Sequence, residues 1–302
     1  MPRPSTPSEL LIRQRLRVLM GLLPAARKGE VEPIHKARVA TRRLREALPV
    51  AMARSRARRL ERKVRRLTRA LGPVRELDVA LETLDSLDTA SVPAGALNRL
   101  KQVIRQERRR LHADMCREVS RVDLEKLRRR IARLAAKGRL TASEAARDPK
   151  RLARARQLAA RRAFRLGAAM DSAAGIYLPD RLHEVRIAGK KLRYALEVVR
   201  DLSGSRSEGG LRVLKEAQDL LGRMHDLEVL IARVRAIQGS ARAPNLRLSG
   251  DLDRLVRRLE TECRQIHSRY TVLRPKLVAV CDRTVAAADG NQRSGRRSGS
   301  AA

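Results

Sequence analysis

Aromatic residues are nearly absent from this sequence, which has no tryptophan, one phenylalanine and three tyrosines among its 302 residues. A hydrophobic core must therefore be aliphatic, and a chain of this length with 43% hydrophobic residues can build one. An aliphatic core of this kind favours helices packed on helices. The scarcity also argues against a protein that binds single-stranded nucleic acid by stacking bases on aromatic rings.

Cysteine is scarce as well, and its spacing carries no recognisable motif. Cys116, Cys263 and Cys281 are odd in number and far apart, so they offer no disulfide framework, no CxxC pair and no zinc-binding spacing. We expect free thiols in a reducing compartment and no metal site.

Long hydrophobic runs are missing too. The longest candidate near the N-terminus, residues 18–23, is interrupted by Gly21 and followed by Pro24. It falls well short of the ~20 apolar residues that a membrane-spanning helix needs. An amphipathic first helix fits this segment better than a secretion signal, and we expect a soluble cytoplasmic protein with no membrane partner.

Acidic residues are outnumbered. Lysine and arginine total 69 against 33 aspartates and glutamates, which gives a formal net charge of +36. A compact chain with this charge repels itself unless an anion neutralises it, so a polyanion is the first partner to consider. A GC-rich genome could also enrich arginine, but that would not explain where the charges gather.

Apolar residues recur at spacings of three and four between short breaks rich in Pro, Gly and Ser, which is typical of helices. No segment shows the alternation of a strand. We therefore predict an all-α fold between a flexible N-terminus, residues 1–7, and a disordered tail, residues 288–302. The predicted helices cover residues 8–23, 33–53, 56–71, 74–87, 94–119, 124–136, 149–170, 180–201, 211–221, 224–237 and 249–287.

Two sequence blocks occur twice. "IHKARVATRRLREAL", residues 34–48, returns as "LHEVRIAGKKLRYAL", residues 182–196, at an offset of 148. "LGPVRELDVAL", residues 71–81, returns as "LGRMHDLEVLI", residues 221–231, at an offset of 150. Matched blocks in the same order predict an internal duplication: two pseudo-symmetric four-helix bundles, in halves of about residues 8–145 and 146–287.

The first repeated block is amphipathic. At about 100° per residue, His35, Arg38, Arg42 and Arg45 fall within an arc of about 80°, opposite a face of Ala and Leu. In the second copy the equivalent positions form a second stripe of His183, Arg186, Lys190 and Arg193. One further cation flanks each stripe: Arg43 in the first copy and Lys191 in the second.

A solvated basic face is the simplest explanation of such a stripe. Solvated faces usually interleave Glu at i,i+4 to relieve repulsion, however, and the first stripe has only Glu46 near it. We therefore favour anion binding. The histidine that opens each stripe can donate a hydrogen bond to an oxyanion, and a phosphate beside it would raise its pKa.

The second repeated block adds cations unequally. One helical face before Leu71-Gly72 carries four arginines, whereas the second half mixes cations with Glu216 and Asp219, so the first half should bind anions more strongly. Each Leu-Gly pair predicts a helix that ends at a left-handed glycine, with the next helix turning back. The further candidates from these blocks are Arg62, Arg65, Arg66, Arg69, Arg75, Arg212, Lys215 and His225.

Two pairs of carboxylates follow the glycines: Glu76 and Asp78 in the first half, Asp226 and Glu228 in the second. They could act as catalytic acids. No nucleophile or metal cluster accompanies them, so we prefer to interpret them as braces that hold arginines and join the two halves.

At these residues the sequence resembles the CHAD domain, the conserved-histidine α-helical domain. The resemblance rests on "HKARVATRRLR" and "HEVRIAGKKLR" with "LGPVRELDV" and "LGRMHDLEV", and extends over about residues 8–287. It implies two pseudo-symmetric four-helix bundles with a basic channel at their junction that binds inorganic polyphosphate, in a family associated with polyphosphate granules. Where the family often has Arg-Asp after Leu-Gly, this chain has Arg75-Glu76 and His225-Asp226.

The resemblance assigns the two stripes to the channel lining: His35, Arg38, Arg42, Arg43, Arg45, His183, Arg186, Lys190, Lys191 and Arg193. Two repeated basic helices facing each other would line a continuous groove for a linear polyanion. We expect polyphosphate binding without catalysis and without a cofactor.

Two alternatives remain. A basic helical protein could bind nucleic acid non-specifically through its phosphate backbone, although no helix-turn-helix or zinc-finger pattern is evident. An enzyme acting on polyphosphate is the other, since CHAD-like domains are often joined to a triphosphate-tunnel module with an ExExK signature. Here the nearest string, residues 30–34, lacks the lysine, and neither a Walker loop nor HExxH occurs.

Overall fold

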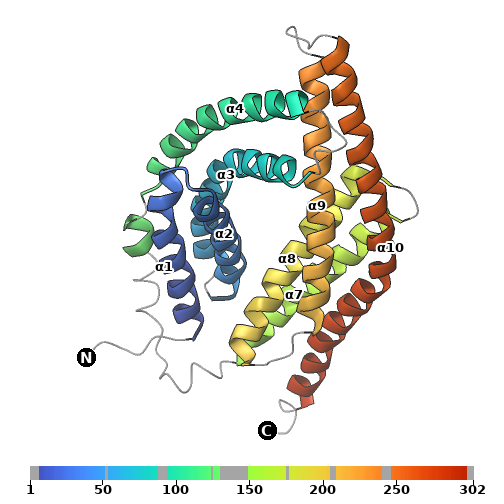
Figure 1. Cartoon of the computed structure of the whole chain (residues 1–302). Helices are drawn as coiled ribbons and strands as arrows, with labels where there is room; N and C mark the ends of the chain where they lie inside the picture. Colours follow the sequence, from blue (N-terminus) through green and yellow to red (C-terminus); the bar gives the residue numbers. More distant parts are fainter. Residues whose placement is uncertain are drawn as a thin grey trace.

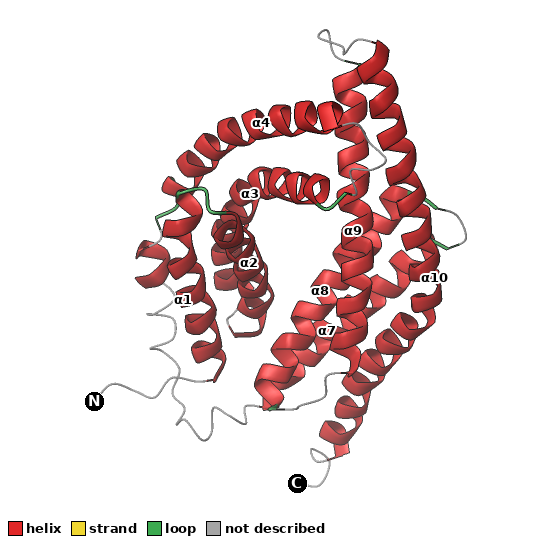
Figure 2. Ribbon diagram, in the orientation of Figure 1, coloured by secondary structure: helices red, strands yellow, loops and turns green. Residues whose placement is uncertain are grey.

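The computed structural model describes residues 7–51, 54–87, 94–123, 125–129, 149–174, 177–204, 209–239 and 246–297. Within these ranges the regular structure is helical and no strand occurs, which confirms the predicted all-α fold (Figures 1 and 2). The helices are α1 (Pro7–Arg27), α2 (Val31–Ala51), α3 (Arg54–Asp85), α4 (Ala94–Ser120), α7 (Pro149–Ser172), α8 (Pro179–Ser203), α9 (Gly209–Gln238) and α10 (Leu246–Arg297).

The helices form two sets, one before and one after the predicted boundary near residue 146. Helices α1 to α4 pack in sequence order, and so do α7 to α10, where α10 also returns to α7 (Figure 1). The two sets meet where α2 lies against α8 and α3 lies against α9. These contacts bring the two copies of each repeated block together.

The core is aliphatic, as the composition predicted. The largest fully buried side chains are leucine, isoleucine and methionine, including Leu19, Leu44 and Ile104. One hydrophobic cluster lies mainly among α1 to α3. The other lies among α7 to α10 and extends into the end of α3 and the beginning of α4. Because α3 and α4 contribute to both clusters, the two sets interlock rather than forming independent domains.

Helix α8, which carries the second basic stripe, has well-defined ends. Pro179 occupies its first turn, where a missing N–H costs no helical hydrogen bond. At the other end Gly204 adopts a left-handed conformation with φ 67°, and its N–H donates to Arg200 O at 3.0 Å.

The predicted helix ends at the two Leu-Gly pairs are wrong. Helix α3 runs through Gly72 and α9 runs through Gly222, and the described residues with positive φ are Gly29 and Gly204. Pro73 does not end α3 either, because a proline inside a helix can be accommodated at the loss of one hydrogen bond. The four helices predicted over residues 56–71, 74–87, 211–221 and 224–237 are therefore two continuous helices, α3 and α9.

The C-terminal boundary also differs from the prediction. Helix α10 continues to Arg297, ten positions past the predicted end at residue 287. A polar sequence without proline can extend a helix that is already nucleated, because each added residue gains a hydrogen bond. Residues 1–6 and 298–302 lie outside the described residues, and of the predicted helix 124–136 the structure describes the helical segment 125–129.

The three cysteines are free, with Cys263 and Cys281 buried. None of the helices described is both long enough and apolar enough to span a bilayer.

Candidate functional site

Cations from both helix sets gather where α2 and α3 meet α8 and α9. Packing of α2 against α8 and of α3 against α9 brings their polar faces within electrostatic reach of one another. We name this group the junction cluster: His35, Arg38 and Arg42 of α2, Arg75 of α3, His183, Arg186 and Lys190 of α8, and His225 and Asp226 of α9.

Arg42 lies at the centre of the cluster. Its charge repels Arg38 on its own helix, and it also repels Arg186 and Lys190 on α8. Arg38 and Arg186 repel each other across the junction as well. The two basic stripes therefore face each other, as the repeat suggested.

Most of these cations lack a close carboxylate. Arg42 and Lys190 make no hydrogen bond or ion pair with any described residue. Arg38 donates from Nη1 to the backbone oxygen of Thr68 at 3.1 Å. The acid inside the cluster, Asp226, lies 3.9 Å from Arg186, and the buried Nε of Arg186 has no partner among the described atoms.

Burial and mutual repulsion depress the basicity of the cluster. Burial, with repulsion from Arg186 and Arg42, lowers the pKa of Lys190 to about 6. Burial and the charge of Arg42 lower the pKa of Arg38 to about 10. Lys190 is therefore largely neutral at pH 7 unless an anion joins the cluster.

Two histidines touch at one end of the cluster. Nδ1 of His183 lies 3.1 Å from Nδ1 of His225, and the ring centroids are 4.5 Å apart. One nitrogen must donate and the other accept, so the two imidazoles cannot both be protonated in this arrangement. Burial and Arg186 lower the pKa of His225 to about 3, and the same causes lower the pKa of His183.

His35, the first-half counterpart of His183, lies beside Arg75. Burial and the charge of Arg75 lower its pKa, so the ring is neutral at pH 7 and can donate one hydrogen bond to an anion. Arg75 itself is held by Glu82 through two hydrogen bonds of 2.8 and 3.1 Å.

Gly72 allows Arg38 to enter the cluster. A Cβ at this glycine would lie 2.9 Å from Nη1 of Arg38, whereas a Cβ at Gly222, the matching glycine of the second half, would meet nothing within 4 Å. The glycine that we interpreted as a helix end thus serves a close approach inside a helix.

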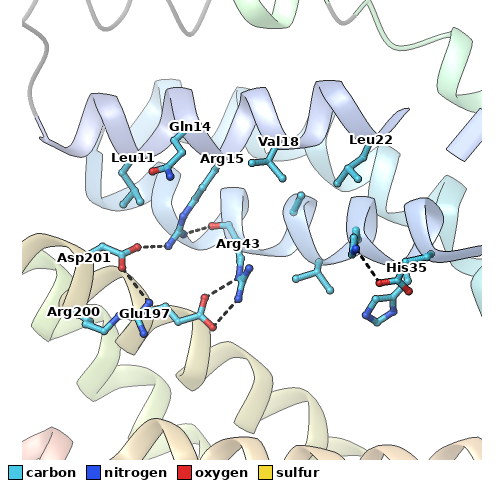
Figure 3. Close-up of a pocket in the computed structure, with 14 residues that line it drawn as sticks. Leu11, Gln14, Arg15, Val18, Leu22, His35, Arg43, Glu197, Arg200 and Asp201 are labelled. Atoms are coloured by element: carbon cyan, nitrogen blue, oxygen red, sulfur yellow. Dashed lines mark hydrogen bonds and ion pairs between the residues drawn. The ribbon is translucent and has the colours of Figure 1, made fainter. Parts of the chain in front are cut away.

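Two predicted site residues contact Glu197 of α8, and one of them, Arg43 of α2, links the two helix sets. Arg43 donates to both carboxylate oxygens of Glu197, at 2.9 and 3.4 Å, and Arg193 lies 3.6 Å from the same carboxylate. Figure 3 shows Arg43 reaching from α2 to Glu197 of α8, and Arg15 of α1 bonded to Asp201.

These ion pairs border a cavity of about 920 Å³ between α1, α2 and α8. His35 also lines this cavity, which therefore opens beside the junction cluster (Figure 3).

The remaining candidates lie away from the cluster centre. Arg45 and Lys191 lie near Glu46, which Arg162 bonds at 3.0 Å. The others are exposed on the N-terminal halves of α3 and α9, where Arg212 precedes His225 by about 20 Å of helix. This exposed group consists of Arg62, Arg65, Arg66 and Arg69 on α3 with Arg212 and Lys215 on α9.

The four carboxylates of the second repeated block mostly brace arginines. Glu76 lies 3.4 Å from Arg233 of α9, Asp78 bonds Arg108 of α4, and Asp226 faces Arg186. Glu228 instead accepts a hydrogen bond of 2.7 Å from the hydroxyl of Tyr177. Across the described ranges, no group of three or more His, Cys, Asp or Glu side chains is arranged to hold a metal ion.

Comparison with known proteins agrees with this architecture. The family model of the CHAD domain matches residues 10–235. The crystal structure of the CHAD domain from the plant Ricinus communis matches with a TM-score of 0.64 and 20% identity, over 92% of this chain and 93% of that one.

A second solved structure, PptA from Streptomyces chartreusis, matches with a TM-score of 0.62 and 17% identity, over 89% of this chain and 99% of that one. No curated protein sequence gives a significant match. These structural likenesses show the fold, and the family match covers most of the chain. The protein is a member of the CHAD domain family.

Proposed function

We propose that this protein binds inorganic polyphosphate in the junction cluster and does not act on it chemically. The observation that carries the proposal is the set of partly buried basic side chains without carboxylate partners among the described residues, Arg38, Arg42 and Lys190. Unpaired buried charge is costly, and an oxyanion would remove that cost.

The form of the cluster favours a linear phosphate chain over a single phosphate. Its cations come from α2 and α8 in two rows, so a ligand with repeated negative charge can contact both rows at once. Arginine offers a planar fork to two oxygens, and lysine a mobile point charge. Family membership supports the same ligand, because the CHAD resemblance implies polyphosphate, and it suggests a place at polyphosphate granules.

Nucleic acid is the weaker candidate because few aromatic rings are available for stacking. Tyr194 and Tyr270 are 4% and 2% exposed, and the hydroxyl of Tyr177 is engaged by Glu228. Phe164 is 75% exposed but lies on α7, outside the junction cluster. Contact with a nucleic-acid backbone would then rest on charge alone.

Absence of catalysis is part of the proposal. The carboxylate inside the cluster, Asp226, faces Arg186, and burial raises its pKa while Arg186 and Lys190 oppose that rise. Incubation of the protein with polyphosphate and Mg²⁺ or Mn²⁺ should release no phosphate above a protein-free control. Release that disappears in Asp226→Asn would make the protein an enzyme and contradict the proposal.

The binding test compares two double variants. Arg42→Ala/Lys190→Ala should weaken binding of polyphosphate of about a hundred units by roughly 100-fold, since charge-assisted hydrogen bonds contribute about 1.5–3 kcal/mol each. Arg257→Ala/Arg269→Ala removes the same charge from the exposed face of α10 and should bind like the unmodified protein.

Fluorescence titration across a salt series measures the affinity of each variant for polyphosphate, and duplex DNA as competitor measures the preference for polyphosphate over DNA. Equal losses in the two variants, or DNA that displaces polyphosphate at equal phosphate concentration, would show a general anion surface instead of a dedicated site.

A further inference from the structure

Three arginines form a stripe on the outer face of α7, beyond the residues that the repeat singled out. Arg154, Arg161 and Arg165 are separated by seven and four positions, so they share an arc of about 40° on the helix. All three are exposed, and none makes an ion pair with the part of the chain that the structure describes.

The stripe borders a groove. A cavity of about 510 Å³ lies between α7, the end of α2 and the beginning of α3. Besides the stripe, its lining includes a fourth unpaired arginine, Arg58 of α3, and one acid, Glu61. We call this cavity the α7 groove. Its cations outnumber its acid, and the three stripe arginines and Arg58 have no ion-pair partner among the described residues.

Cations connect the α7 groove to the junction cluster. Arg165 lies within electrostatic reach of Lys191, which also feels Arg45. Arg45 in turn lies near Arg42, the centre of the junction cluster. The acid beside this path, Glu46, is occupied by Arg162, which also lines the groove. Cations of α2, α8 and α7 therefore form a continuous path from the junction cluster to the groove.

We propose that the α7 groove is a second binding segment for the same linear polyanion, which takes the part of a phosphate chain that extends beyond the junction cluster. This inference rests on the proposed function. From His35 to Arg45 alone, α2 rises about 15 Å, so a short oligophosphate cannot contact the whole path. Long chains reach both segments. Once the junction cluster holds one part of the chain, the rest of it is at a high effective concentration near the α7 groove, so binding there adds affinity.

The test uses two ligands and two triple variants. The groove variant, Arg154→Ala/Arg161→Ala/Arg165→Ala, removes the three positive charges of the stripe. Arg257→Ala/Arg264→Ala/Arg269→Ala removes the same charge from exposed positions on α10 and serves as the matched control. Each protein is titrated with tripolyphosphate and with polyphosphate of about a hundred units over a salt series.

The groove variant should lose about tenfold or more in affinity for the long chain while its affinity for tripolyphosphate stays within about twofold. The slope of log K against log salt for the long chain should fall by about 2, because three phosphate contacts are lost at ~0.7 each. The α10 control should keep both affinities and the slope.

The outcomes separate this inference from the function on which it rests. If the unmodified protein binds neither ligand, the proposed function fails. If it binds both and the groove variant matches the α10 control, the junction cluster acts alone and the groove has no part in binding. Equal losses for the short and the long ligand would also contradict a second segment, because the stripe would then act on the junction site itself.

Discussion

In the junction cluster, Arg42 and Lys190 lie among other cations, and neither has a described carboxylate in ion-pair contact. Where α3 meets α4 and α9, by contrast, the central arginines are held by acids. There Arg108 bonds Asp78, and Arg233 bonds Glu107 and lies 3.4 Å from Glu76. Both regions are rich in arginine. One is neutralised within the fold, and the other is not neutralised by the residues that the structure describes.

The number of cations alone therefore does not locate the site. Arg43 flanks the stripe that contains Arg42, and Arg193 belongs to the same stripe as Lys190, yet both contact Glu197, and Arg43 thereby joins α2 to α8. Neutralisation by neighbours separates structural arginines from those that can bind a ligand.

The largest expected effect comes from removing an arginine in the neutralised region, where α3 meets α4 and α9. Arg108→Ala leaves Asp78, which is 2% exposed, as a buried charge without its cation. Breaking a buried pair in this way costs about 3–5 kcal/mol. We expect the free energy of unfolding in urea to fall by about that amount.

Polyphosphate affinity of Arg108→Ala should stay within about twofold below its unfolding transition. Arg42→Ala is its counterpart and should show the opposite pattern, with weaker binding and an unfolding free energy that does not fall. A loss of binding in Arg108→Ala while the protein is fully folded would mean that the two regions are not separate.

The next effect is a dependence of binding on pH. Lys190 has a pKa of about 6 in the free protein, and a bound phosphate chain would raise it. Binding then takes up a proton above pH 6, so the affinity should fall with rising pH by up to about tenfold per unit. Lys190→Met should flatten the profile between pH 6.5 and 8.5, the range above that pKa in which binding takes up the proton.

Isothermal titration in buffers of different ionisation enthalpy measures this proton directly. The His183 and His225 pair is the other titratable group nearby, and Asp226 and Arg186 face Lys190 from the adjoining helices. A profile that stays steep in Lys190→Met would assign the proton to the histidines instead.

Much of this site follows from the sequence because helix periodicity and repetition are local properties. The arc from His35 to Arg45 and its copy on α8 were predicted to face each other, and the packing of α2 on α8 brings them together. The all-α fold and the aliphatic core follow equally from composition.

The remainder depends on tertiary contacts between distant residues. Arg43 and Glu197 are 154 positions apart, and nothing local indicates that they pair. The glycine at 72 satisfies a local rule for helix ends, but a guanidinium from another helix decides its role. The stripe of Arg154, Arg161 and Arg165 is visible as a periodic pattern, but the groove in front of it requires the packing of α7 against α2 and α3.

A smaller effect concerns the stability cost of the unpaired cluster. The folded-state pKa of Lys190 lies far below that of an exposed lysine, so the unfolded chain binds more protons above pH 6. Stability should therefore rise with pH from about 6 towards the unfolded-state pKa of about 10.4. Lys190→Met should raise the melting temperature of the ligand-free protein at pH 7, by about 1 kcal/mol in free energy.

Addition of polyphosphate should reverse that order, since the ligand stabilises the unmodified protein more than the variant. A ligand-free Lys190→Met protein that melts below the unmodified one at pH 7 would mean that the lysine is already satisfied in the fold.

The smallest effect compares the two glycines of the repeated Leu-Gly pair. Each substitution by alanine inside a helix should stabilise the fold by about 0.5–1 kcal/mol, since glycine is the poorer helix former. A Cβ at 72 would crowd Nη1 of Arg38, whereas a Cβ at 222 meets nothing within 4 Å. Gly72→Ala should therefore weaken polyphosphate binding roughly threefold, a loss of about 0.6 kcal/mol, while Gly222→Ala should gain stability and keep its affinity. Equal affinities in the two variants would show that the position of the Arg38 side chain does not affect ligand binding. The set of residues proposed to bind the phosphate chain would then be reduced to Arg42, Arg186 and Lys190.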